Sequence, residues 1–267
     1  MTKAIVVGAA GRMGGRIINA INETEGIELV GAVEYNGHPA IGKDAGEVAG
    51  LGKLNIKLKD NLDTILGLGD VIIDFTNHTA SLTHLEIAAK GKKSIVIGST
   101  GFSANEMEEV KRLSKNTRCV LSPNMSVGVN LLFKVIKDIS MVLGDEFDIE
   151  IIEAHHRFKK DAPSGTAMRI AQILAQTLKR DLDEVGVYGR KGIVGERTQK
   201  EIGIQGIRAG DIVGDHTVIF GGLGERLEIT HRAHSRDTLA RGAVRAAKWI
   251  VNQKNGLYDM QDVLGLK

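Results

Sequence analysis

The segment from residue 153 to residue 166 combines basic side chains with the expected start of a helix. Five of the six residues at positions 155–160 are basic, and the chain then runs through Pro163 into Ser164, Gly165 and Thr166. Ser164 is suited to cap a helix, and the N–H groups of Gly165 and Thr166 are expected to bind an anion. Histidine is the residue best suited to proton transfer near neutral pH. The segment therefore suits a small substrate with more than one carboxylate; the alternative is a solvated basic loop.

A glycine-rich turn at positions 8–14, Gly-Ala-Ala-Gly-Arg-Met-Gly, separates a short apolar run from a helical pattern. Glycines at such a point let the backbone approach a diphosphate, which the helix N-terminus then holds. The spacing is G-x-x-G-x-x-G, because Ala10 takes the place of the usual middle glycine. Glu34 follows Gly14 by twenty residues, where a carboxylate can accept hydrogen bonds from ribose hydroxyls. A plain glycine turn is the alternative, and Glu34 favours a dinucleotide site.

Two further segments follow predicted parallel strands. They are Gly98-Ser99-Thr100-Gly101-Phe102 and Ser122-Pro123-Asn124-Met125. Because the carboxyl ends of such strands line the ligand crevice, we expect both segments to face the nicotinamide end of a bound cofactor. The alternative is a pair of ordinary connecting loops.

The elements that must position these residues differ between the two halves of the chain. In the first half, short apolar runs alternate with helical patterns, which predicts strands at 4–8, 28–33, 70–75, 94–97 and 118–121 and helices at 12–21, 79–90 and 104–114. Continuous apolar strands separated by helices are typical of a parallel sheet covered on both faces. The first half therefore predicts an α/β fold with a doubly wound parallel sheet of the Rossmann type.

The second half predicts an α+β domain. The patterns indicate helices at 127–143, 165–178 and 236–252, and strands at 148–155, 202–208, 216–220 and 226–230. In the last strand, Leu227 and Ile229 alternate with Glu228 and Thr230, which is typical of a mixed or antiparallel sheet with one exposed face. We therefore expect a dinucleotide-binding domain at residues 1–126 and a substrate-binding and oligomerisation domain at residues 127–234.

Composition narrows the class of protein. The 267 residues carry 35 Lys and Arg against 33 Asp and Glu, a balance that gives no support to nucleic-acid or membrane binding. Cys119 is the single cysteine, and the adjacent His155 and His156 would point to opposite faces of an extended segment, so we expect no metal site. The longest uncharged stretch, 119–133, is shorter than the ~20 apolar residues of a spanning helix. With no targeting segment visible, we expect a cytoplasmic protein.

Four more motifs join those above, at residues 70–76 (Asp-Val-Ile-Ile-Asp-Phe-Thr), 126–130 (Ser-Val-Gly-Val-Asn), 208–214 (Arg-Ala-Gly-Asp-Ile-Val-Gly) and 225–231 (Glu-Arg-Leu-Glu-Ile-Thr-His). Together, and in this order, the motifs resemble the 4-hydroxy-tetrahydrodipicolinate reductase family, also called dihydrodipicolinate reductases, of bacterial lysine and diaminopimelate biosynthesis. The resemblance covers essentially the whole chain.

The resemblance implies that NADH or NADPH gives a hydride to C4 of a cyclic imine, with loss of water, and that the neighbouring carbon takes a proton. It implies that His155 and Lys159 are the acid–base pair and that His156, Gly165 and Thr166 bind the substrate carboxylates. It implies a cofactor site made of Gly8, Ala9, Ala10, Gly11, Arg12, Met13, Glu34, Gly98, Ser99, Thr100, Ser122, Pro123, Asn124 and Met125. It also implies a homotetramer and a first domain completed by residues 235–267.

The sequence departs from the family pattern at two positions. Many members carry Arg or Lys after the acidic residue, where it can meet the 2′-phosphate of NADPH, but this chain has Tyr35. The missing cation predicts a preference for NADH. Ser99 stands where threonine is common, and it keeps the hydroxyl.

Two other functions are alternatives to this one. A different two-domain dehydrogenase acting on a small carboxylate would not combine His155 and His156 with Lys159 and the Pro-Ser-Gly-Thr helix start. A non-catalytic nucleotide sensor would keep the glycine turn and Glu34 but would not need His155 or Lys159.

Overall fold

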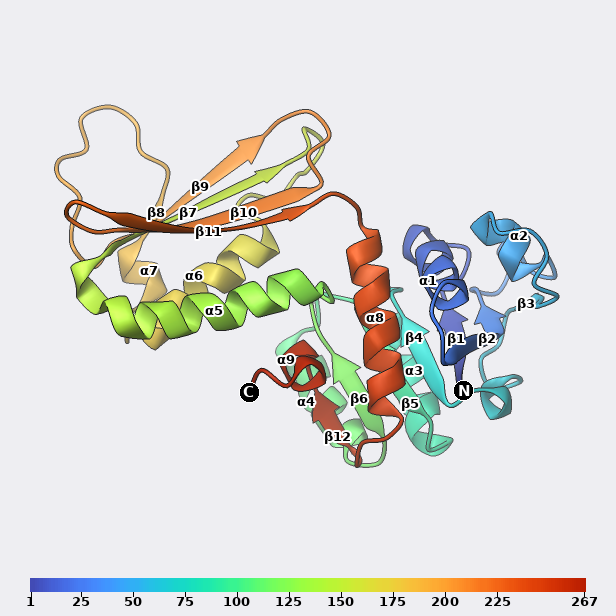
Figure 1. The fold of residues 1–267 in the computed structure, drawn as a ribbon. Helices are drawn as coiled ribbons and strands as arrows, with labels where there is room; N and C mark the ends of the chain where they lie inside the picture. Colours follow the sequence, from blue (N-terminus) through green and yellow to red (C-terminus); the bar gives the residue numbers. More distant parts are fainter. The chain divides into compact units, whose positions relative to one another are not determined.

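The computed structural model describes residues 1–267 and divides them into two compact units. The first unit is made of Met1–Val127 and Asp237–Lys267, and the second of Gly128–Arg236. The chain therefore leaves the first unit once and returns to it through the last 31 residues, coloured red in Figure 1. The functional roles expected for the two units stay predictions.

The first unit contains a sheet of seven strands whose neighbouring pairs are all parallel. In spatial order the strands are β12 (Gly256–Tyr258), β6 (Arg118–Leu121), β5 (Ser94–Ile97), β4 (Val71–Asp74), β1 (Thr2–Val7), β2 (Ile27–Val33) and β3 (Leu58–Lys59). The sheet confirms the doubly wound α/β class, because the order reverses on either side of β1.

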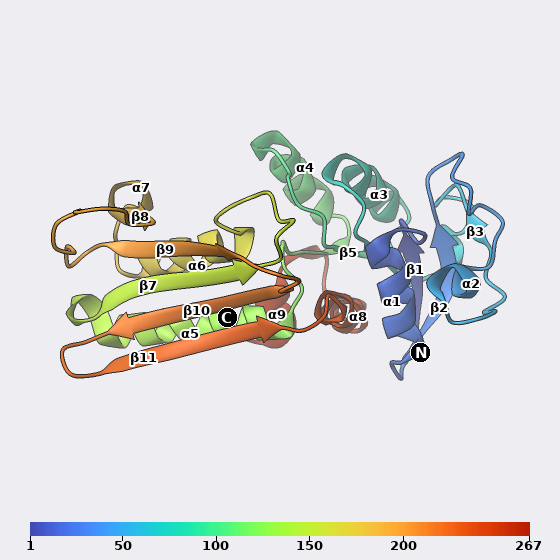
Figure 2. The ribbon, with the colours of Figure 1, turned by 90° about the horizontal axis from the view of Figure 1, so that it is seen from above.

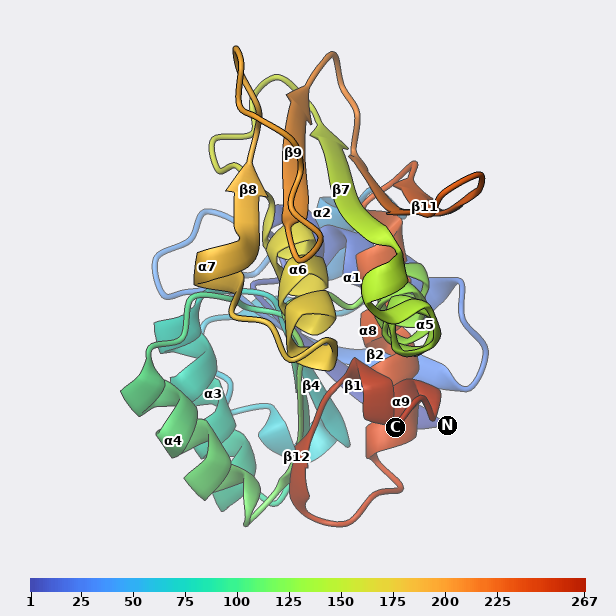
Figure 3. The ribbon, with the colours of Figure 1, turned by 90° about the vertical axis from the view of Figure 1, so that its left-hand side faces the viewer.

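Helices cover both faces of this sheet (Figure 3). They are α1 (Arg12–Asn22), α8 (Asp237–Ile250) and α9 (Met260–Leu264) on one face, and α3 (His78–Lys90) and α4 (Ala104–Ser114) on the other. In β4, Val71 and Ile73 pack with the first set of helices and Ile72 with the second. Because successive strand residues face opposite sides, a strand buried on both faces reads as an unbroken apolar run. The short α2 (Ala45–Ala49) and η1 (Leu66–Leu68) complete the unit.

The second unit contains a mixed sheet of five strands. In spatial order they are β11 (Arg226–Ala233), β10 (Gly214–Gly221), β7 (Asp148–His155), β9 (Ile202–Arg208) and β8 (Gly186–Tyr188). The helices α5 (Val127–Leu143) and α6 (Gly165–Thr177) cover one face, as Figure 2 shows, and leave the other open. The mixed α+β class is thereby confirmed. The short η2 (Gly144–Glu146) and α7 (Leu182–Val185) complete the unit.

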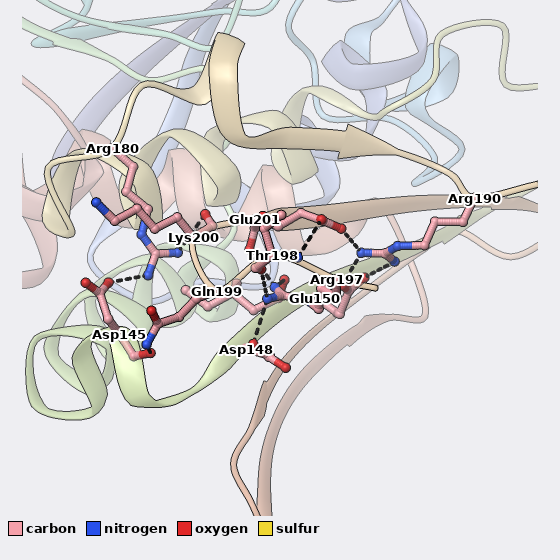
Figure 4. Close-up of polar contacts among 11 residues, drawn as sticks. Asp145, Asp148, Glu150, Arg180, Arg190, Arg197, Thr198, Gln199, Lys200 and Glu201 are labelled. Atoms are coloured by element: carbon pink, nitrogen blue, oxygen red, sulfur yellow. Dashed lines mark hydrogen bonds and ion pairs between the residues drawn. The ribbon is translucent and has the colours of Figure 1, made fainter. Parts of the chain in front are cut away.

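Arginines tie the loop between β8 and β9 to the start of β7 (Figure 4). Arg197 donates to Asp148 at 2.6 Å and to Glu150 at 3.2 Å, and it also bonds the carbonyl oxygen of Ile149 at 3.0 Å. Arg190 donates to both carboxylate oxygens of Glu150. A Cβ added at Gly203 would overlap Glu150, so β9 can run beside this carboxylate only with glycine at that position. These contacts hold β9 in register with β7.

The shortest elements lie outside those predicted. β3, β8 and β12 have two or three residues each, and so short a strand shows no periodicity to read. The sequence predicts no element after the helix at 236–252, but in the structure β12 pairs with β6 and α9 follows. The hairpin of β10 and β11 is also longer than predicted, beginning at Gly214 and ending at Ala233, because the two strands pair along their whole length.

None of the helices combines the length and the apolar character that a membrane-spanning segment requires. The cytoplasmic location stays a prediction.

Candidate active site

The second unit places His155 at the carboxyl end of β7, on the face covered by the helices. Every second residue of this strand is buried, so Glu153 and His155 follow Ile149 and Ile151 on the same face. The Nδ1 atom of His155 lies 2.5 Å from Oε2 of Glu153. The same alternation of buried residues that builds the apolar core therefore places the Glu153–His155 pair at the edge of that core.

Lys159 lies in the loop that follows β7. Its Nζ donates to both carboxylate oxygens of Asp161 at 2.8 Å, and its backbone N–H donates to the carbonyl of His156 in a turn. The hydrogen bond from Lys159 lowers the pKa of Asp161. The side chain of Lys159 is 20% exposed, so most of it is shielded from water.

Burial lowers the pKa of His155 below its usual value. Glu153 opposes this shift through its hydrogen bond and its charge, while the positive charges of Lys159 and Arg208 add to it. The neutral ring therefore predominates at pH 7. Lys159 follows His155 by four residues, in the loop after β7, and the pairing of the two as catalytic residues stays a prediction.

The expected helix start is present at α6. Ser164 caps the helix, its Oγ accepting from the N–H of Ala167 at 3.1 Å. Gly165 and Thr166 are the first two residues of α6, and a Cβ added at Gly165 would meet nothing within 4 Å. No neighbouring atom therefore requires glycine at this position, and the absence of a side chain leaves room for a ligand beside the backbone. The first N–H groups of a helix suit an anion.

The remaining predicted substrate residue, His156, is half-buried. Its Nδ1 is enclosed without a hydrogen-bond partner, and its ring tilts against Phe158 with centroids 6.3 Å apart.

Sequence reasoning missed His216, which belongs to none of the motifs. His216 lies on β10 directly beside Glu153, and its ring meets that of His155 edge-on with centroids 5.2 Å apart. Its Nε2 lies 3.1 Å from Oγ of Ser164. The alternation of His216 with Val218 and Phe220 could have placed it on a buried face, where a histidine needs a polar partner.

Stability should depend on pH through His216. Burial lowers its pKa from 6.5 to about 4. Between these pH values the unfolded chain holds a proton that the folded chain lacks, so the free energy of unfolding falls as the pH decreases through this window, by up to about 3 kcal/mol. We expect His216→Gln to lose less stability than the wild type between pH 6.5 and pH 4. Urea unfolding of both proteins at the two pH values measures this, and equal losses would contradict it.

The first unit forms the glycine turn where β1 meets α1. Gly8 has φ +67°, a conformation that favours glycine, and a Cβ added at Gly14 would lie 2.1 Å from the carbonyl oxygen of Gly8. α1 thus packs directly on the turn. Its N-cap, Gly11, supplies no side-chain hydrogen bond, and the first turn has no acidic residue. This uncapped N-terminus fits the diphosphate of a dinucleotide.

Glu34 is buried and reaches the glycine turn. Its Oε2 accepts from the N–H of Ala10 at 3.0 Å, and its Oε1 accepts from the N–H of Tyr35 at 3.1 Å. Each carboxylate oxygen can accept a second hydrogen bond, so Glu34 remains suited to ribose hydroxyls. Tyr35 is 65% exposed and meets the ring of His38 edge-on.

The segments after β5 and β6 lie at the ends of adjacent strands. Ser122 donates its backbone N–H to the carbonyl of Ile97, and Oγ of Ser99 lies 2.8 Å from Oγ of Ser81. Thr76 follows β4, and its hydroxyl lies beside that of Ser81. A Cβ added at Gly8 would overlap the methyl group of Thr76, so Thr76 also lies against the glycine turn. The predicted cofactor residues therefore follow the carboxyl ends of β1, β5 and β6, except Glu34, which follows β2. Arg12, Thr100 and Pro123 are exposed, and Met13 and Asn124 are half-buried.

The structure shows no group of three or more histidine, cysteine, aspartate or glutamate side chains that could hold a metal ion. Cys119 is fully buried, and burial raises the pKa of its thiol to about 12. A thiol in this environment is an unreactive part of the core.

Known proteins match both units. The family described as "Dihydrodipicolinate reductase, N-terminus" matches residues 2–125, and "Dihydrodipicolinate reductase, C-terminus" matches residues 128–264. The 4-hydroxy-tetrahydrodipicolinate reductases of Syntrophus aciditrophicus and Geotalea uraniireducens are 61% and 58% identical, over 100% of both chains. A dipicolinate-bound dihydrodipicolinate reductase from Paenisporosarcina has the same fold, with a TM-score of 0.78, 22% identity and 98% coverage of each chain.

These matches extend through the glycine turn, the basic loop and the start of α6, and they confirm the resemblance carried by the motifs. The chain belongs to the dihydrodipicolinate reductase family.

Proposed function

We propose that this chain reduces 4-hydroxy-tetrahydrodipicolinate to tetrahydrodipicolinate with NADH or NADPH, in lysine and diaminopimelate biosynthesis. One hydride and one proton are consumed, and one water leaves. The observation that carries the proposal is that Glu153 joins His155 to the N-terminus of α6 in the second unit, beside the loop that carries Lys159, in a chain whose whole length matches this family. A non-catalytic protein that only senses a nucleotide would not need His155 or Lys159.

The proposed substrate carries two carboxylates. We assign their binding to His156 and to the start of α6 at Gly165 and Thr166. The open space at Gly165 and the helix N-terminus support this assignment. The neighbouring basic residues would raise the local concentration of a dianion.

His155 and Lys159 are the proposed acid–base pair. Their task is to deliver the proton that the ring carbon beside C4 takes during reduction. Because the neutral His155 ring holds its proton on Nδ1, against Glu153, this proton comes from the ammonium group of Lys159, either directly or by way of Nε2 of His155. The partial burial of both side chains supports this role, because a shielded group exchanges protons with the substrate in preference to bulk water. Asp161 holds the ammonium group of Lys159 in place.

The glycine turn at 8–13, Glu34 and the segments 98–100 and 122–125 are the proposed cofactor site. NADH or NADPH, when bound there, supplies the hydride. The uncapped N-terminus of α1 and the close packing at Gly14 support a diphosphate at the turn.

The proposal is tested by following the oxidation of NADH and of NADPH with freshly prepared substrate. We expect substrate-dependent oxidation with both cofactors. No substrate-dependent oxidation with either one would contradict the proposal.

NADH is the proposed preferred cofactor, by about tenfold in kcat/KM, or about 1.4 kcal/mol. Glu34 repels a 2′-phosphate, and Tyr35 offers no positive charge. The Nδ1 of His38 accepts from the N–H of Ala40, so this nitrogen is already engaged within the chain. Arg12 is exposed and forms no ion pair, which makes it the one competing cation in the turn.

We expect Tyr35→Arg to move the preference toward NADPH. The measurement is kcat/KM for both cofactors at one ionic strength, because salt screens phosphate binding. An unchanged ratio would show that residue 35 does not face the 2′ position, and a wild-type preference for NADPH would point to Arg12.

Two-carboxylate recognition is tested by inhibitors. Pyridine-2,6-dicarboxylate should compete with substrate, while pyridine-2-carboxylate should bind at least about tenfold more weakly, because one charge-assisted hydrogen bond contributes about 1.5–3 kcal/mol. Inhibition constants from initial rates give the comparison. Equal inhibition by the two compounds would exclude the assignment of both carboxylates to this loop.

A homotetramer is the proposed assembly. The open face of the second sheet carries Ile152, Ile207 and Ile219, of which Ile207 is 47% exposed. Apolar side chains on an uncovered sheet face favour association with further copies. Sedimentation equilibrium measures the mass, and a stable monomer would contradict the assembly.

A further inference from the structure

Glu153 is a fully buried carboxylate to which the motifs assign no role. Removing a carboxylate from water is costly unless charged or donor groups surround it. Arg208 donates to both its oxygens, at 2.9 and 2.8 Å. Burial acts to raise the pKa of Glu153, but hydrogen bonds from Arg208 and His155 outweigh it and lower the pKa. The carboxylate therefore stays ionised at neutral pH.

An ionised carboxylate accepts hydrogen bonds and donates none. The 2.5 Å contact with Glu153 therefore places a proton on Nδ1 of His155. In the neutral ring, Nε2 is then left with its lone pair, and it makes no hydrogen bond within the chain. A Cβ added at Gly214 would lie 3.1 Å from this Nε2, so glycine there leaves space around the nitrogen.

The same carboxylate also holds the start of α6. Oε1 of Glu153 accepts the backbone N–H of Ser164 at 3.1 Å, one residue before Gly165. Arg208, which completes the set, begins the motif at 208–214 and also donates to the carbonyl of Asp161. The backbone N–H of Ala209 donates to the carbonyl of His155 at 2.9 Å. One buried group thus joins β7, β9 and α6 at the point where all three meet the basic loop.

We propose that Glu153 is a positioning residue, supported by Arg208, that directs the Nε2 lone pair of His155 toward the substrate and fixes the ring relative to the N-terminus of α6. Its role in turnover rests on the proposed reductase function. The charged and titratable groups that face His155 are Glu153 on β7, Lys159 in the loop, Arg208 on β9 and His216 on β10.

The first test is the tautomer of His155 in the wild-type chain. Nitrogen-15 NMR of the ligand-free protein, labelled at histidine, distinguishes a protonated Nδ1 from a protonated Nε2. We expect Nδ1 to carry the proton in the neutral ring. A proton on Nε2 would overturn the proposal, and this result does not depend on whether the protein has reductase activity or whether any variant folds.

The second test compares Glu153→Gln with Glu150→Gln. Glu150 is a matched control because it lies on the same strand and pairs with arginines, but on the opposite face of β7. We expect Glu153→Gln to lower kcat at least about tenfold, since the carboxylate behind the histidine of serine proteases contributes more than this. NADH binding should be unchanged, and Glu150→Gln should lose stability with little change in kcat.

The His155 pKa gives a third readout. Glu153 raises that pKa in the wild type, so Glu153→Gln should lower it and weaken the preference for a proton on Nδ1. If Glu153→Gln and Glu150→Gln had equal effects on kcat and on the His155 spectrum, Glu153 would have only a structural role and the proposal would be wrong. If the wild-type protein had no reductase activity but carried the proton of His155 on Nδ1, the proposed function would be wrong, while the geometry proposed for the His155 ring would stand.

Discussion

Replacing His155 by alanine should lower kcat by about 10²-fold or more, the usual contribution of a positioned acid–base group. The variant loses Nε2, the ring nitrogen that is left with its lone pair, and no other histidine can replace it. His216 is the nearest ring, but burial lowers its pKa to about 4 and its Nε2 is engaged by Ser164. Steady-state rates at saturating NADH measure the loss.

Cofactor binding is the control for this variant. The proposed cofactor residues lie in the first unit, so the Kd for NADH should stay within about twofold of the wild-type value. Circular dichroism should show an intact fold, because Glu153 keeps its pairing with Arg208. Near-normal turnover in His155→Ala would remove this residue from the mechanism.

Replacing Lys159 by alanine should reduce kcat by a similar factor, about 10²-fold, because a proton donor and a positive charge are lost together. The adjacent Lys160 offers a matched control, since it is exposed and forms no ion pair in the structure. Lys160→Ala should retain turnover close to that of the wild type. If both variants lost activity equally, the net charge of the loop would matter more than the placement of Lys159.

Lys159→Ala should also change the titration of its neighbours. The charge of Lys159 lowers the pKa of His155 and its hydrogen bond lowers that of Asp161, so both pKa values should rise in the variant. An NMR titration of His155 detects this shift without any turnover. A constant pKa would place the ammonium group too far away to share a proton with His155.

Local sequence patterns were enough to predict most of the fold. Apolar runs that are continuous in the first half and alternating in the second distinguish a sheet buried on both faces from one buried on a single face. They located β4, β5 and β6 and the long helices α5 and α6 nearly to the residue. The glycine turn and the helix start at Ser164 were equally readable, because both depend on the conformation of a few consecutive residues.

The sequence also indicated which kinds of chemical group lie at the candidate site. A histidine and a lysine four residues apart, followed by a capped helix start, indicate proton transfer beside a bound anion. Both proposed catalytic side chains and the start of α6 lie in one continuous stretch of chain, so no long-range pairing had to be guessed to group them.

Tertiary structure decided which groups surround these residues. His216 reaches His155, and Arg208 reaches Glu153, through the pairing of β10 and β9 with β7. The sequence shows that a residue on a buried face needs a polar partner, but strand order and register choose the partner. Those depend on contacts between residues more than fifty positions apart, which no local periodicity records. The state of the His155 ring, and hence which nitrogen can exchange a proton, is therefore a property of the folded sheet.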